Sequence, residues 1–245
     1  MWAEMAGWLR GDPRPDEVCD RVALTARKVV SGCEHAGVFL ADRAGDLHVV
    51  PTTGDDVGRV VEVVQRETGQ GPCRHTYLVE NSCVIGSFGQ ERRWPEFCRR
   101  AARETGMTSM MSLRLFVDDT TVGVLVCYSG QRGAFDASTA ALGAGLAMPA
   151  SLAIAASRQR ERAANLECAL ASNQEIGIAV GILMAQHACT RDEAFHILRL
   201  LSQDRNIKLR DLARILANTG SVPQHTRTRL VLLPTKQTVV GTIGD

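Results

Sequence analysis

The chain has 245 residues, of which 45% are apolar and 22% charged, close to the usual composition of globular proteins. This excludes a collagen-like or wholly disordered chain, and the length suits one large domain or two smaller ones. With 28 Lys and Arg against 27 Asp and Glu, the net charge is +1, so any nucleic-acid contact has to come from a local basic patch. Aromatic residues amount to 4%, which argues against a protein that reads bases mainly by stacking.

The eight cysteines are scattered without Cys-x-x-Cys spacing, and the six histidines give no zinc-finger spacing. We therefore expect reduced thiols, no metal site and a cytoplasmic protein. Acidic residues and prolines interrupt the N-terminal stretch, where a signal peptide needs a continuous apolar run. No run reaches 18 apolar residues, so we expect no membrane-spanning segment and no membrane partner.

The first elements predicted are a helix and a β-hairpin. Apolar residues at steps of three or four predict a helix over Pro15–Ser31, which Gly32 ends in a left-handed conformation. Strand-like runs follow at His35–Ala41 and Leu47–Thr52, and the turn residues between them predict a hairpin.

The following segments complete an α+β domain. Helical spacing predicts helices over 55–68 and Glu91–Glu104. Together with the strands, they indicate a sheet flanked by helices, in which the last two strands form a second hairpin. The remaining strands are predicted at Ser82–Ser87, Met110–Val117 and Val122–Tyr128.

From Asp136 to His187, the spacing of apolar residues predicts one long helix. Steps of four and three alternate along it for more than four heptads, which is typical of a coiled coil, so we expect a homodimer through this helix. Asn173 is of the type that fixes register, and Pro149 should kink or interrupt the helix. The alternative is a single helix lying on its own domain. The dimer seam is expected at Leu152, Gln159, Leu166, Leu170, Asn173 and Val180.

Two shorter helices are predicted over 191–202 and 208–218. Thr190 and Glu193 have the spacing of a capping box before the first of them. Helices this short are not stable alone, so we expect both to pack with the end of the long helix. The predicted domains are a lead-in at 1–14, an α+β domain at 15–135, a linking coiled-coil helix at 136–167, a three-helix domain at 168–220 and a disordered tail at 221–245.

Four short segments of the first half occur in a characteristic order: Gln70–Cys73, Arg93–Phe97, Gly123–Ser129 and Ala134–Asp136. They resemble a GAF domain, in the form common in actinobacterial regulators. The resemblance implies a GAF-type antiparallel sheet flanked by helices, and a sensory domain that binds a small molecule.

Three segments of the second half, Ile176–Met184, Glu193–Phe195 and Asn206–Ala213, are similar to an ANTAR domain. This family provides the RNA-binding output module of bacterial transcription antitermination regulators. The resemblance implies binding to pairs of stem-loops in nascent transcripts. The family often has Lys where this chain has Val180, so one cation is missing from the expected RNA face.

Independently of the resemblance, five cations lie between Arg199 and Arg214, opposed by two aspartates, and phosphates are attracted to such a patch. Free backbone donors at the start of the last helix add a docking place for phosphate. We expect Phe195 to pack in the core rather than stack on a base, and Gly181 to permit tight helix packing. The alternative is a DNA-binding regulator that uses the last two helices as a helix-turn-helix. The predicted RNA-binding residues are Arg199, Arg205, Asn206, Lys208, Arg210 and Arg214.

In the first half, a ligand pocket is expected near Cys73, His75 and Trp94. Cys73 is expected in a loop, either as a ligand-contacting or reactive thiol or as an inert small side chain. His75 could ligate a metal or haem, or simply lie exposed. No Walker A, Gly-x-Ser-x-Gly or His-Glu-x-x-His motif occurs, so we expect no catalytic residues and no enzyme, and the cofactor stays unknown.

These observations predict a signal-responsive transcription antitermination regulator. The GAF-like half would sense a small molecule or a redox signal. That signal would change the packing or register of the long helix, and so pair or release the two RNA-binding modules of a cytoplasmic homodimer.

Overall fold

The computed structural model of the chain describes Met5, Thr52 and residues 7–42, 44–50, 56–117 and 120–221. The chain divides into two compact units, Met1–Asn165 and Leu166–Asp245, and helix α6 contributes residues to both of them. We describe each unit by itself. Apart from Ser221, the expected disordered tail lies outside the described residues.

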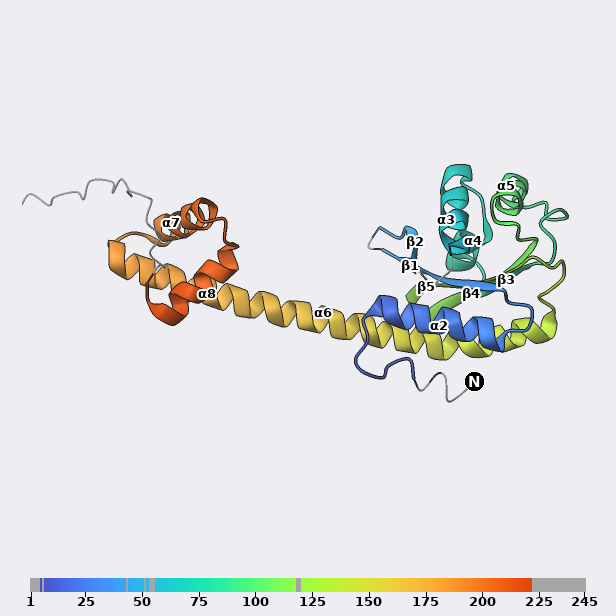
Figure 1. Ribbon diagram of the computed structural model, residues 1–245, viewed down its shortest axis with the longest axis horizontal. Coiled ribbons are helices and arrows are strands. Elements are labelled where there is room, and N and C mark those ends of the chain that lie inside the picture. Colours follow the sequence, from blue (N-terminus) through green and yellow to red (C-terminus); the bar gives the residue numbers. More distant parts are fainter. Residues whose placement is uncertain are drawn as a thin grey trace, which may run out of the picture. The chain divides into compact units, whose positions relative to one another are not determined.

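The first unit contains a five-stranded antiparallel sheet with the order β2-β1-β5-β4-β3 (Figure 1). Central strand β5 pairs with β1 in a register that sets Phe39 opposite Val124, and with β4 in one that sets Leu113 opposite Leu125. The predicted α+β fold and both hairpins are confirmed. The strands are β1 His35–Ala41, β2 Leu47–Val50, β3 Ser82–Ile85, β4 Ser109–Val117 and β5 Thr120–Ser129.

Helices cover both faces of this sheet (Figure 1). One face carries α2 and the first part of α6, and the other carries α3, α4 and α5. Strand β5 therefore buries Val124 and Val126 on one side and Leu125 and Cys127 on the other, which explains its unbroken apolar run. The helices are α2 Pro15–Val29, α3 Val57–Thr68, α4 Pro72–Leu78, α5 Pro95–Thr105 and α6 Ala137–His187.

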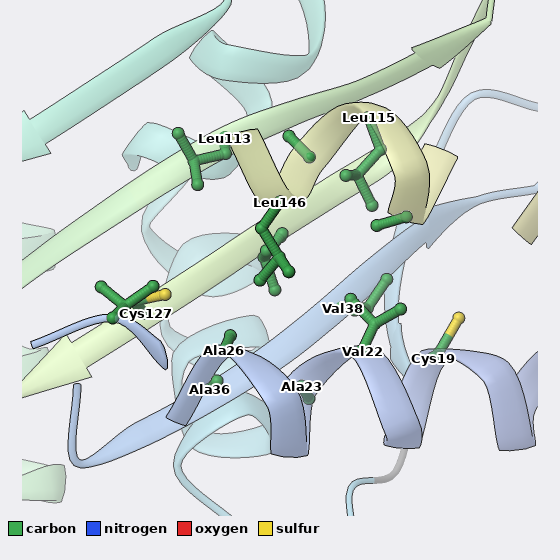
Figure 2. Packing of buried hydrophobic residues seen from close by; sticks show 14 of the residues in the cluster. Cys19, Val22, Ala23, Ala26, Ala36, Val38, Leu113, Leu115, Cys127 and Leu146 are labelled. Carbon is green, nitrogen blue, oxygen red and sulfur yellow. The ribbon is translucent and has the colours of Figure 1, made fainter. Parts of the chain in front are cut away.

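Helix α6 packs on the sheet through small and aliphatic side chains. Leu146 is fully buried beside Leu113 and Leu115 of β4 (Figure 2). At Gly143, an added Cβ atom would lie 2.7 Å from a methyl carbon of Leu113, so this glycine permits the close approach of helix and strand. Ser151 Oγ also accepts a hydrogen bond from the Phe116 N–H at 3.0 Å.

The expected interruption at Pro149 was wrong, because α6 continues through it as one helix of 51 residues. Proline removes the hydrogen bond to the carbonyl four residues earlier, which here belongs to Gly145. Gly145 lies on the exposed side of the helix, and the helix continues despite the missing bond.

The N-terminal lead-in packs against α2. Trp8 is buried, and its Nε1–H donates a hydrogen bond of 3.0 Å to Thr25 Oγ1. Arg21 donates hydrogen bonds to the backbone carbonyls of Gly7, Trp8 and Arg10 at 3.0 to 3.1 Å. These contacts fix the path of the chain into α2.

The predicted turn chemistry is confirmed in the first hairpin and in part after α2. Gly32 has a φ of 77°, in the left-handed region as expected, but α2 already ends at Val29 with Val30 as its C-cap, so Gly32 does not cap the helix. In the first hairpin, the Asp42 carboxylate accepts hydrogen bonds from the Asp46 N–H at 3.0 Å and the Ala44 N–H at 2.8 Å. The backbone of Asp46 and Ala44, together with His48, holds the pKa of Asp42 below its usual range.

The second unit is a three-helix domain built from the end of α6, α7 Arg191–Asp204 and α8 Leu209–Thr219. α7 and α8 occupy the two predicted helical segments and each extends slightly further towards the C-terminus. Their apolar stripes close a small core with the end of α6. This core consists of Ala179, Val180, Leu183, Ala194, Leu198, Leu201, Leu212, Ala213 and Leu216.

One helix, α6, is long and apolar enough to span a membrane by length and composition alone. A count of consecutive apolar residues does not detect α6, because small polar residues interrupt its apolar sequence without adding charge. The qualifying window is 44% buried inside the protein, and Leu146 and Ile154 of this helix pack in the core beneath the sheet. Part of this apolar window therefore belongs to the core of the first unit.

Leu146→Ala should lower the free energy of unfolding of the first unit by about 2–5 kcal/mol, because it leaves a cavity between α6 and the sheet. The exposed residue Met148 offers a matched control on the same helix, and Met148→Ala should change this free energy by at most about 0.5 kcal/mol. Urea unfolding followed by tryptophan fluorescence reports on this unit, since Trp8 and Trp94 lie in it and no tryptophan follows Trp94 in the sequence. Equal unfolding midpoints for the two variants would contradict the packing of α6.

Candidate nucleic-acid interface and sensory pocket

Helix α7 begins at the predicted capping box. Thr190 Oγ1 accepts a hydrogen bond from the Glu193 N–H at 3.4 Å, and the Thr190 N–H donates to the Glu193 carboxylate at 2.9 Å. The backbone and side-chain hydrogen bonds from Thr190 hold the pKa of Glu193 below its usual range. This cap and three inward-facing side chains set the rotation of α7. Those side chains are Ala194, Leu198 and Leu201.

A tight turn leads from α7 into α8. Asn206 has a φ of 51°, in the left-handed region that asparagine tolerates better than most residues. Ser202 Oγ closes the turn by donating a hydrogen bond of 2.6 Å to the carbonyl of Ile207. Lys208 then occupies the N-cap position of α8. The turn thus presents two exposed side chains, Asn206 and Lys208, beside the start of a helix.

Two exposed arginines, Arg210 and Arg214, lie one turn apart on α8, on the side away from its buried residues. The carboxylate of Asp211 lies 2.7 Å from Arg214 and 3.9 Å from Arg210. Exposed ion pairs of this kind contribute at most about 1 kcal/mol, so an incoming phosphate competes readily for both guanidinium groups.

The remaining predicted RNA contacts lie outside α8. Arg199 is exposed on α7, where its guanidinium group lies 3.5 Å from His196 Nδ1. Arg205 is the C-cap residue of α7 and is half-buried, which makes it less available than the others. One turn and one helix therefore carry Asn206, Lys208, Arg210 and Arg214, while Arg199 belongs to the preceding helix.

Two expectations about the second unit were wrong. Phe195 does not pack in the core but is 42% exposed, because it lies one residue away from the inward-facing stripe of α7. Gly181 does not mark tight helix packing, because it is exposed and open space surrounds the position of a Cβ atom.

Most residues of the predicted dimer seam are exposed in the single chain. Leu166 and Leu170 are each 61% exposed, and Leu152 is also exposed. Gln159 and Asn173 are exposed as well. Val180 departs from the expectation: it is 5% exposed in the three-helix core, so its side chain is not available to a partner.

The first unit contains a pocket of about 560 Å³ between the first hairpin and helices α3 and α4. Cavities of this size suit small organic ligands. Its lining combines apolar surface with both signs of charge, and it includes residues that no sequence motif singles out, since they are spread over four elements. Among the lining residues are Phe39, His48, Glu62, Arg66, Arg74 and Tyr77.

Cys73 lines this pocket from the first turn of α4 rather than from a loop. Its N–H donates a hydrogen bond of 3.0 Å to Gln65 Oε1, which lies close to Gly71, where the φ is 141°. Burial raises the pKa of the Cys73 thiol to about 12, so it stays protonated at neutral pH. All eight cysteines of the chain are free thiols.

His75 and Trp94 are not among the lining residues of this pocket. Their rings contact each other edge to face, with centroids 5.4 Å apart, and His75 Nε2 lies 3.1 Å from the Glu80 carboxylate. The guanidinium group of Arg93 lies 4.4 Å from the centre of the Trp94 ring. In the described part of the chain, no group of three or more His, Cys, Asp or Glu residues has the arrangement of a metal site.

Comparison with known proteins identifies both halves. A GAF domain model matches residues 13–155, and an ANTAR domain model matches residues 164–216. No curated protein matches the chain. The GAF match covers the residues that line the pocket, and the ANTAR match covers the turn with Asn206 and Lys208 and helix α8 as far as Leu216.

Solved structures resemble the first unit at low identity. A domain of a putative sensor histidine kinase from Sinorhizobium meliloti is 17% identical and covers 58% of this chain and 92% of its own, with a TM-score of 0.46. A free methionine-R-sulfoxide reductase from Neisseria meningitidis is 18% identical; the match covers 64% of this chain and 87% of the reductase, with a TM-score of 0.48. The family match spans more than half of the chain, which therefore belongs to the GAF domain family and carries an ANTAR antitermination RNA-binding domain after its GAF sensor domain.

Proposed function

We propose that this chain is a signal-responsive transcription antitermination regulator that binds RNA hairpins through its ANTAR domain. The observation that carries the proposal is the basic turn, which we define as Asn206, Lys208, Arg210 and Arg214. Its three cations are exposed, and Lys208 stands at the N-cap of α8, whose first turn offers backbone donors. Stem-loop RNA is recognised largely through its backbone and shape, and phosphates are attracted to such a group of cations.

We propose that the protein acts as a homodimer through α6. Residues 159–171 are all exposed in the single chain, although Leu166 and Leu170 lie among them. Isolated helical segments of this length are marginal in water, and a second copy would bury the exposed leucines. Val180 is no longer part of the proposed seam. The proposed seam consists of the other predicted residues, Leu152, Gln159, Leu166, Leu170 and Asn173.

The GAF pocket is the proposed sensor site, in a GAF domain of the form common in actinobacterial regulators. Its volume and mixed lining favour a small polar molecule. A signal through the Cys73 thiol is less favoured, because burial keeps that thiol protonated and a thiol reacts as the thiolate. We assign no catalytic residue and no enzymatic activity to this site.

In the proposed mechanism, ligand binding to the GAF domain changes the packing or register of the two α6 helices. That change pairs or releases the ANTAR domains. A paired dimer then grips two hairpins of a nascent transcript in the cytoplasm, masks a terminator and lets transcription continue. A helical bundle suits this role because it has few alternative packings.

A DNA-binding helix-turn-helix remains the second candidate, because four residues connect α7 to α8, as such motifs require. Filter binding to a two-hairpin RNA and to duplex DNA of equal length separates the candidates. We expect the RNA to bind more tightly. A preference for duplex DNA would refute the RNA proposal.

Replacing Lys208 and Arg210 together by Ala should reduce the salt dependence of RNA binding. Each lost phosphate contact lowers the slope of log affinity against log salt by about 0.7–0.9, so the double variant should lose about 1.4–1.8. Filter binding over a range of salt concentrations measures the slope. Arg27→Ala with Lys28→Ala removes two adjacent exposed cations from α2 and should leave it unchanged. An unaltered slope in the first double variant would place the phosphate contacts elsewhere.

Asn173→Leu should change the association of the chain, because a polar residue in a coiled-coil seam fixes register and strand number at a cost in stability. We expect native mass spectrometry to show a dimer for the wild type and a more stable or higher-order assembly for the variant, with altered RNA affinity. Asn165→Leu makes the same exchange on an exposed position outside the seam and should change neither quantity. Unchanged mass and affinity in Asn173→Leu would remove the argument from register.

A further inference from the structure

Helix α7 exposes a phenylalanine that the three-helix core does not need. The core uses Ala194 and Leu198 of this helix, and Phe195 points about 100° away from Ala194 around the helix axis. Its side chain is 42% exposed. A single exposed apolar residue is ordinary in itself, so the chemistry of its neighbours has to identify what it binds.

Two exposed cations flank Phe195 on the same face of α7. Arg191 precedes it by four residues and Arg199 follows it by four, so each lies about 6 Å away along the axis. Asp192 and His196 border this face, whereas Glu193 lies about 160° around the helix axis from Phe195 and is held by Thr190 in the capping box. With one aspartate beside two arginines, the local charge is positive. We call Arg191, Phe195 and Arg199 the aromatic face of α7.

This arrangement fits nucleic acid better than another protein. A protein contact usually centres on a cluster of apolar anchors. The other exposed large apolar residue of α7, Leu200, lies about 140° around the helix from Phe195, so the two do not form one patch. An unpaired base, in contrast, needs a single aromatic ring to stack on and cations nearby for its phosphates.

We propose that Phe195 stacks on an unpaired base in the loop of an RNA hairpin, with Arg191 and Arg199 contacting the adjoining phosphates. The inference rests on the proposed RNA-binding function and adds a place where the protein distinguishes a looped RNA from a plain duplex. Phe195 then supplies an aromatic ring, which none of the residues of the basic turn has.

The test uses the full chain and two RNA probes. One is a ten-base-pair stem closed by a loop of eight randomised nucleotides, and the other is the same stem as a blunt duplex. Phe195→Leu keeps an apolar side chain but loses the aromatic ring, and it should weaken binding to the looped probe about fivefold to a hundredfold. Binding to the blunt duplex should not change. Phe195→Trp should bind the looped probe at least as tightly as the wild type.

Leu200→Ala is the matched control, since it shortens another exposed side chain of α7 and should leave both affinities unchanged. The inference is overturned if Phe195→Leu binds the looped probe like the wild type, or loses affinity for both probes equally. A changed subunit number with unchanged RNA affinity would assign Phe195 to a protein contact instead. Failure of the wild type to bind either RNA would refute the proposed function itself, whereas binding that depends on Lys208 and Arg210 but not on Phe195 would refute this inference alone.

Discussion

The central strand of the GAF sheet is apolar on both sides, so both faces of the sheet have to be covered. Val124 and Val126 face the layer of α3, α4 and α5, while Leu125 and Cys127 face α2 and α6. Burial of these side chains from water is the main favourable term for this unit. It also makes α6 part of the sensor core, because Leu146 and its neighbours on α6 supply one of the two covers.

The same helix supplies Ala179, Val180 and Leu183 to the core of the ANTAR domain. Both ends of α6 are therefore held by packing within their own unit, and the residues between them, 159–171, have only exposed side chains. With this distribution of burial, α6 connects the core of the sensor domain to the core of the RNA-binding domain. A change in packing at the sensor core acts on a helix that also builds the RNA-binding domain.

Strands, turns and helix caps were predicted well because they depend on interactions between residues that are close in the sequence. The run His35–Ala41 coincides with β1, and the turn chemistry at Asp42 and the capping box at Thr190 are both found. Errors arose where tertiary context decides. The heptad spacing predicted that Val180 lies in a seam between two chains, although its side chain packs in the core of its own three-helix domain. The apolar character of Phe195 alone predicted that it lies in this core, although it is 42% exposed. Of the three predicted pocket residues only Cys73 lines the pocket, and the other lining residues could not be predicted because the fold gathers them from separate elements.

The exposed middle of α6 has a consequence for proteolysis. Local opening of a helix is favoured where few side chains are buried, and trypsin cleaves after arginine. Arg160 and Arg162 lie within the exposed segment 159–171, outside both hydrophobic cores. Cleavage there would separate the sensor from the RNA-binding domain while leaving each core whole, so in the proposed dimer the second α6 helix would also protect this segment from trypsin.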